Sequence, residues 1–204
     1  AGGGGDAVVF AGRIYWISGN TRGHEGPVSA LVDVFDPASG RFTPLSPIPH
    51  PRDHFFAVER NGRVYVAGGR DSNAGVDGDI FDDTLAQIDV YDIANDRWTT
   101  LPPGTDLPTP RAAAATGIIG AELIIAGGES SALTQAHPQT EALDLNLLQW
   151  RTLTPMRTPR HATQAIVSNS GLYVAAGSAL RGGPSSTPLD LEALHLYGVT
   201  APSN

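Results

Sequence analysis

A set of residue markers recurs about every fifty residues along this 204-residue chain. A glycine doublet, or its remnant, occurs four times and ends at Gly19, Gly69, Gly128 and Gly177. Successive copies are therefore 50, 59 and 49 residues apart. A Pro-Arg pair keeps the same register, because Arg52, Arg111 and Arg160 follow one another at 59 and 49 residues. Repeats of this length indicate units that stack on one another or close into a circle.

Each unit has the pattern of four short strands. In the second unit the expected strands are residues 55–58, 64–67, 87–91 and 97–101. Asn61-Gly62 lies between the first two and is a strong hairpin signal, because both residues tolerate positive φ. The run Val64–Ala67 is continuously apolar, as expected of a strand buried on both faces. No segment shows a convincing helical period, so the sequence predicts an all-β chain.

A pair of large side chains completes each of the first three units. Phe35 and Phe42, Tyr91 and Trp98, and Leu143 and Trp150 are each seven residues apart. Paired glycines, a following Tyr and Trp at fixed spacing, and a Pro-Arg that opens the next unit resemble the kelch motif. The resemblance extends over essentially the whole chain. The chain departs from the motif at Ser18 and Ala176 in the doublet, and at Leu143 in the aromatic pair.

The resemblance implies a kelch-type β-propeller of about four four-stranded blades, all within one segment, residues 1–204. The approximate blades are residues 5–46, 52–103, 111–155 and 160–197. The last blade is expected to be incomplete, because residues 198–204 make a poor fourth strand. Kelch propellers as a family have more blades than this. We therefore expect part of a larger ring, closed by further blades or by a second copy of the chain.

A narrower resemblance concerns the segment Pro159–Ala165, followed by Ala176-Gly177-Ser178 and Arg181-Gly182-Gly183. It is similar to the galactose-oxidase-type kelch domains of bacterial secreted proteins, which implies a secreted or cell-surface location. The chain has no cysteine, whereas the copper cofactor of galactose oxidase needs a Cys joined to a Tyr. That radical-copper activity is therefore excluded. Whether the chain has another enzymatic activity stays open, and a non-catalytic role is favoured.

Charge and hydropathy narrow the classes of partner. The net charge of −8 argues against nucleic acid, whose phosphates require basic patches. No apolar run approaches the 18 residues that a membrane-spanning helix needs. The expected partner is therefore a protein or a glycan.

The residues after each Pro are the main candidates for a binding site. By the resemblance they open the innermost strand of a blade and approach the mouth of the channel. The candidate ligand-binding residues are Arg52, Asp53, His54, Arg111, Arg160 and His161. Arginines gathered there would suit an acidic sugar or a carboxylate, because a guanidinium offers two parallel donors. The alternative is that each Arg satisfies backbone carbonyls or a carboxylate of a neighbouring blade.

An acidic loop follows the second glycine doublet. Asp71, Asp77 and Asp79 alternate with Gly and Asn, which supplies oxygen ligands on flexible backbone and suits calcium. The loop lacks the bidentate Glu of an EF-hand. The alternative is a solvated surface loop with no metal.

These observations predict a non-catalytic binding or assembly module. It would bind a protein or glycan through the long loops, since loops on a rigid scaffold carry most binding functions. Two other classes stay open: a carbohydrate-active enzyme of the kelch fold, and a structural subunit of an extracellular assembly.

Overall fold

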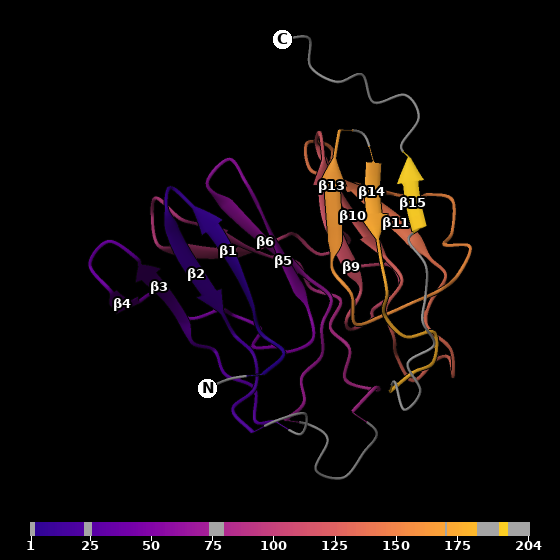
Figure 1. Ribbon diagram of the computed structural model, residues 1–204, viewed down its shortest axis with the longest axis horizontal. Helices are drawn as coiled ribbons and strands as arrows, with labels where there is room; N and C mark the ends of the chain where they lie inside the picture. Colours follow the sequence, from indigo (N-terminus) through magenta and orange to yellow (C-terminus); the bar gives the residue numbers. More distant parts are fainter. Residues whose placement is uncertain (1–2, 23–25, 74–79, 170, 183–191, 196–204) are drawn as a thin grey trace. The chain divides into compact units, whose positions relative to one another are not determined.

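The chain folds into antiparallel sheets joined by turns. The computed structural model describes residues 3–22, 26–73, 80–169, 171–182 and 192–195. Within these ranges no helix is long and apolar enough to cross a membrane. The chain divides into two compact units, Ala1–Ala112 and Ala113–Asn204, and each unit contains two sheets (Figure 1). The all-β prediction is confirmed.

Two four-stranded sheets make up the first unit. The first sheet consists of β1 (Asp6–Phe10), β2 (Arg13–Ile17), β3 (Val32–Asp36) and β4 (Arg41–Pro44). The second sheet consists of β5 (Phe56–Arg60), β6 (Arg63–Ala67), β7 (Asp89–Asp92) and β8 (Arg97–Thr100). Strands that follow one another in the sequence also pair in space, so each sheet is a simple meander.

The second unit repeats this plan. The third sheet consists of β9 (Ala115–Ile119), β10 (Glu122–Ala126), β11 (Thr140–Asp144) and β12 (Gln149–Thr152). The fourth sheet consists of β13 (Ala165–Ser168), β14 (Gly171–Val174) and β15 (Glu192–His195). The described part of the fourth sheet thus has three strands, in agreement with the predicted incomplete blade. Residues 198–204 lie outside the described part of the chain.

The predicted hairpin at Asn61-Gly62 joins β5 to β6. Both residues have positive φ, 54° and 74°, as a tight two-residue turn requires. The Gly62 N–H donates to the Glu59 side chain at 2.7 Å, which closes the turn. The local sequence therefore fixes the register of β5 on β6.

The two sheets of the first unit pack face to face. The first sheet contributes its covering face, formed by Val8, Tyr15, Ile17, Val32 and Val34. The second sheet contributes its receiving face, formed by Ala57, Val64, Val66, Tyr91 and Trp98. The Tyr91 and Trp98 rings are tilted by 35° with centroids 4.9 Å apart, a favourable aromatic geometry. The aromatic pair of the repeat therefore packs one sheet on the next.

The second unit uses the same arrangement. The covering face of the third sheet includes Ala115, Ile124 and Ala126, and it packs on Leu172 and Val174 of the fourth sheet. Gly117 lies at the centre of this contact. A Cβ at Gly117 would come within 2.5 Å of the Leu172 side chain, so only glycine allows the sheets to approach this closely.

The Trp98 indole also bonds across the two sheets of the first unit. Its Nε1–H donates to the Ser46 carbonyl at 2.9 Å. We expect Trp98→Phe to lower the free energy of unfolding by about 1–2 kcal/mol, because an aromatic ring is kept while the hydrogen bond and part of the packed indole are lost. Urea denaturation followed by circular dichroism measures this difference. The matched control is Trp16→Phe on the exposed face of the first sheet, and equal losses in both variants would contradict the assignment.

Candidate functional site

Each Pro-Arg segment lies beside the glycine doublet of the preceding repeat. The second glycine of each doublet donates its N–H to the carbonyl of the following Arg. The three bonds are Gly19 to Arg52 at 3.0 Å, Gly69 to Arg111 at 3.0 Å, and Gly128 to Arg160 at 2.9 Å. This repeated contact, called here the doublet joint, explains why the doublet and the Pro-Arg keep a common spacing in the sequence.

Crowding at the joint explains why glycine occupies the first position of the doublet. A Cβ at Gly68 would lie 2.6 Å from the Arg111 carbonyl oxygen. In the first repeat Ser18 occupies this position, and its Oγ accepts from the Arg52 backbone N–H at 3.0 Å. The departure from the motif at Ser18 therefore adds a side-chain hydrogen bond to the joint.

The Arg52 side chain is fully buried inside the second repeat. Its guanidinium donates to the carbonyls of Gly68 and Gln87, both at 2.9 Å, and to the carboxylate of Asp89 at 2.6 Å. Burial lowers the pKa of Arg52 to about 10, and the charge and hydrogen bond of Asp89 act in the opposite direction. Arg52 therefore remains charged at neutral pH and ties its own sheet together.

Arg111 and Arg160 are buried in comparable positions. Arg111 donates to the Thr109 carbonyl at 2.6 Å, and Arg160 donates to the Ala176 carbonyl at 3.2 Å. Their burial supports the alternative in which each Arg satisfies backbone carbonyls. Direct ligand contact by these guanidinium groups stays a prediction.

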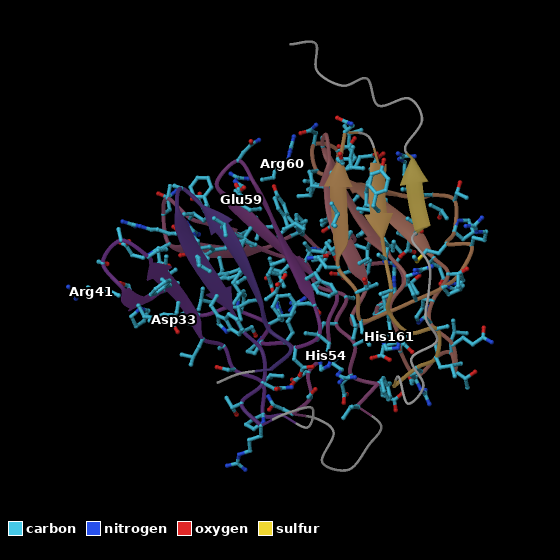
Figure 2. The ribbon with its side chains drawn as sticks, in the orientation of Figure 1. Asp33, Arg41, His54, Glu59, Arg60 and His161 are labelled. Atoms are coloured by element: carbon cyan, nitrogen blue, oxygen red, sulfur yellow. The ribbon has the colours of Figure 1, made fainter. Side chains whose placement is uncertain are left out.

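A polar cluster in the first unit consists of Asp53, His54 and Arg70. The buried Asp53 carboxylate accepts from Arg70 Nε at 3.3 Å and contacts His54 Nδ1. Arg70 Nη2 lies 3.4 Å from His54 Nε2, and its guanidinium is 5.2 Å from the centre of the Phe81 ring. His54 is the most accessible member of the cluster, with 18% of its side chain exposed. Of the predicted residues in this unit, His54 is thus the one best placed to meet a ligand (Figure 2).

The pKa of Asp53 predicts a loss of stability in acid. Burial alone would raise this pKa, but the contact with His54 and the nearby charge of Arg70 lower it overall. A carboxyl whose pKa is lower in the folded state stabilises the fold above its unfolded pKa, near 3.9. That contribution is lost as pH falls through the folded pKa. We expect Asp53→Asn to reduce the difference in unfolding free energy between pH 6 and pH 3.

Asp36→Asn is the control for this measurement. The pKa of Asp36 is also lowered, chiefly by a hydrogen bond from the Ala38 backbone, but Asp36 lies at the end of β3 and is only partly buried. Chemical denaturation at the two pH values should show a larger change for Asp53→Asn. An unchanged pH dependence in Asp53→Asn would contradict the assignment.

His161 occupies in the fourth repeat the position that Asp53 has in the second, and it is almost fully buried. Its Nε2 lies 2.8 Å from the Leu180 carbonyl and 3.4 Å from the Glu129 carboxylate. Glu129 also accepts from the Gly182 backbone at 2.8 Å. His161 therefore holds loop backbone in place. That all six predicted residues share one end of a channel stays a prediction.

The acidic loop lies partly outside the described residues. Asp71 accepts from the Asn73 backbone at 2.9 Å, which makes a local turn. Asp77 and Asp79 fall in the segment that the structure does not describe. No group of three acidic or histidine side chains suited to a metal occurs among the described residues. Calcium binding by Asp71, Asp77 and Asp79 stays a prediction.

Sequence reasoning did not identify Asp89 or Arg70 as partners of the Pro-Arg segment. A signal for Asp89 was present, because an acidic residue stands two positions before the large residue of the third strand in each of the first three repeats. These acidic residues are Asp33, Asp89 and Glu141. No comparable signal marks Arg70, whose equivalents are Asn20, Glu129 and Ser178.

Curated relatives of the chain are kelch proteins. Beta-scruin of Limulus polyphemus is 27% identical over 83% of this chain and 18% of its own length. Kelch-like protein terF of Aspergillus terreus is 28% identical over 92% of this chain and 41% of its own length. Kelch-like protein 40 of mouse is 26% identical over 88% of this chain and 27% of its own length. The chain thus spans less than half the length of these relatives.

A solved structure described as "Structure of YjhT" has the same fold. It superimposes with a TM-score of 0.71 at 22% identity and covers 88% of this chain and 60% of its own. The sequence model of the KLHDC2/KLHL20/DRC7 Kelch-repeats domain matches residues 4–198, which is nearly the whole chain. Together with the doublet joints and the packed aromatic pairs, this match shows that the chain belongs to the kelch-repeat family.

Proposed function

We propose that this chain is a non-catalytic binding module that presents its loop face to a protein partner. The observation that carries the proposal is that the arginines of the repeat form hydrogen bonds inside the fold. Arg52, Arg111 and Arg160 are buried and donate hydrogen bonds to backbone carbonyls, which supports a role in stiffening the sheets. A rigid scaffold of this kind leaves recognition to the loops that follow the glycine doublets.

Contacts between neighbouring loops support this proposal in the first unit. The Asn73 side chain accepts from the Val28 backbone at 2.8 Å, which connects the loop of the second repeat to that of the first. Thr21, Arg22 and Asn73 are exposed beside this contact. The described parts of the two loops are thus tied to each other, which lowers the entropy lost when a partner binds.

Site-specific photo-crosslinking tests the proposal. A crosslinking residue is placed at Arg22 or at Asn73, and in a control at Gln149 on the exposed strand β12. We expect a single partner protein to be captured at both loop positions and not at the control. Arg22→Glu should then weaken binding of the purified partner. Equal capture at all three positions, or none at the loops, would overturn the proposal.

Glycan binding and calcium binding are tested beside the protein partner. A glycan panel screened by calorimetry tests glycan binding. His54→Ala is the variant that should lower the affinity for an acidic sugar. Titration with Ca²⁺ alone tests calcium binding. Asp71→Asn is the variant that should lower the affinity for Ca²⁺. A glycan that binds with high affinity and depends on His54 would replace the protein partner in this proposal.

A further inference from the structure

Five arginines gather at one end of the two sheets of the first unit. In an antiparallel meander the first and third turns lie at one end of the sheet, and the second connection lies at the other. The turn end of the first unit, residues 10–13, 36–41, 59–63 and 92–97, is therefore opposite to the loops that follow the glycine doublets. Figure 2 shows Arg60 at this end and His54 at the other end of the second sheet. The arginines of the turn end are Arg13, Arg41, Arg60, Arg63 and Arg97.

Each sheet ends in a row of residues that face one another across the strands. In the second sheet this end row consists of Arg60, Arg63, Asp92 and Arg97. In the first sheet the end row consists of Phe10, Arg13, Asp36 and Arg41. An aspartate thus lies between two arginines in both sheets.

The third sheet shows which of these residues the fold requires. Its end row keeps the aspartate and has no arginine, and it consists of Ile119, Glu122, Asp144 and Gln149. The aspartate accepts a hydrogen bond from the backbone of its turn in every case, at 2.9 Å for Asp36, 3.1 Å for Asp92 and 2.8 Å for Asp144. The aspartate is therefore structural, whereas this end of a sheet forms without the arginines.

The arginines of the turn end have no partner in the part of the chain that the structure describes. None of the five guanidinium groups donates a hydrogen bond or forms an ion pair there. Arg60 and Arg63 even lie directly opposite each other across the β5–β6 hairpin. Like charges in such a pair are destabilising. These charges therefore oppose folding locally and are available to an external anion.

Four carboxylates share the turn end, but all of them are engaged within the fold. Glu59 accepts from the Gly62 N–H at 2.7 Å. Asp96 accepts from the Ser46 N–H at 2.8 Å and from the Tyr91 hydroxyl at 2.7 Å. The two aspartates of the end rows accept from their own turns. With five arginines against four carboxylates, the turn end is locally positive on a chain whose net charge is −8, and it attracts anions that the rest of the chain repels.

The turn end stays accessible where sheets pack on one another. Arg13 alternates with Tyr15 along β2, so it lies on the covering face of the first sheet, as does Arg41. Both arginines are exposed although the second sheet packs on this face. Arg63 and Arg97 occupy the equivalent positions in the second sheet and are also exposed. The exposure of such an arginine is therefore compatible with a neighbouring sheet on the same face.

The two end rows form one surface. Phe10, which pairs with Arg13, lies against the β5–β6 turn, since a Cβ at Gly62 would be 3.6 Å from its ring. Arg63 and Arg97 are separated by two strand spacings, about 10 Å, and packed sheets are also about 10 Å apart. A single small anion is too short to contact both rows, whereas a chain that carries several carboxylates can do so.

We propose that the turn end of the first unit binds an acidic segment of a partner polypeptide. Carboxylates of the segment pair with Arg13, Arg60 and Arg63, and Arg41 and Arg97 extend the surface towards the outer strands. A guanidinium offers two parallel donors to a carboxylate. A nucleic acid suits the site less well, because its phosphates would continue past the turn end along a negative chain. The site is separate from the loop face of the proposed function and does not rest on it.

Titration of the unaltered protein with short peptides tests the proposal. The probe is a capped hexaglutamate peptide, and its neutral control is the hexaglutamine peptide of the same length. We expect NMR shifts at the amides of Asn61 and Gly62, with an affinity for hexaglutamate about tenfold or more above that for hexaglutamine. This preference should decrease as the salt concentration rises. Equal affinity for the two peptides, or shifts confined to Thr21 and Asn73 at the loop end, would overturn the proposal.

Two double variants separate the local site from net charge. Arg60→Gln with Arg63→Gln should remove the preference for hexaglutamate. Arg151→Gln with Arg157→Gln changes the net charge by the same amount in the second unit and should keep the preference. Circular dichroism and the melting temperature confirm that both variants fold. A similar loss of preference in both would show an effect of net charge alone and contradict the site.

Other occupants of the turn end are tested with the same variants. A single-stranded oligothymidylate that binds more tightly than hexaglutamate, and depends on Arg60 and Arg63, would replace the acidic polypeptide by a nucleic acid. Sedimentation equilibrium without peptide tests self-association. A dimer that Arg60→Gln with Arg63→Gln dissociates would make a second copy of the chain the occupant, and would likewise overturn the proposal.

Discussion

Arg52→Ala is expected to lower the free energy of unfolding by about 3–5 kcal/mol. The variant leaves the Asp89 carboxylate buried without its cation and leaves the carbonyls of Gly68 and Gln87 without a donor. Removing one member of a buried ion pair is costly because the other charge stays desolvated. Urea denaturation at neutral pH, followed by tryptophan fluorescence and circular dichroism, measures the loss.

A double variant at this site separates charge from packing, and a single variant at an exposed ion pair is the control. Arg52→Met with Asp89→Leu removes both charges while keeping much of the volume, and we expect it to recover part of the loss. Arg151→Ala breaks an exposed ion pair with Glu122, in which half of the Arg151 side chain is accessible, and should cost about 1 kcal/mol or less. Similar losses in Arg52→Ala and Arg151→Ala would contradict the structural role of Arg52.

Gly127→Ala is expected to destabilise the second unit by roughly 2–5 kcal/mol. Gly127 has a φ of 71°, where an L side chain is strained, and its Cβ would lie 2.2 Å from the Arg160 carbonyl oxygen. The doublet joint between Gly128 and Arg160 must then lengthen. Denaturation monitored by the Trp150 signal, with the other two tryptophans replaced by Phe, reports on this unit.

Gly40→Ala is the matched control. Gly40 has a nearly equal φ of 67°, and a Cβ there would meet nothing within 4 Å. Its expected loss is about 1–2 kcal/mol, from the backbone conformation alone. The difference between the two variants therefore measures crowding at the joint. If both variants lose the same stability, crowding at the joint makes no contribution.

The repeat spacing predicted the fold because each marker has a fixed geometric task. Asn61-Gly62 specifies a hairpin locally, and Tyr91 with Trp98 specifies a packed face, so both could be read without coordinates. The sequence left two roles open for Arg52, ligand binding and hydrogen bonding within the fold. Its burial, which separates the two, could not be predicted from residue type. His54, Ala113 and Ala162 adopt positive φ without being glycine, which only the surrounding contacts impose.

The doublet joint has a consequence for how such chains change over generations. Its donor and its acceptor are main-chain groups, the N–H of Gly19, Gly69 or Gly128 and the carbonyl of the following Arg. Neither group depends on which repeat supplies it. A gene segment of one period that is duplicated, deleted or exchanged therefore brings a ready-made connection to its new neighbours. The loops between the joints are then free to diverge, so that a single scaffold can acquire new partners by recombination.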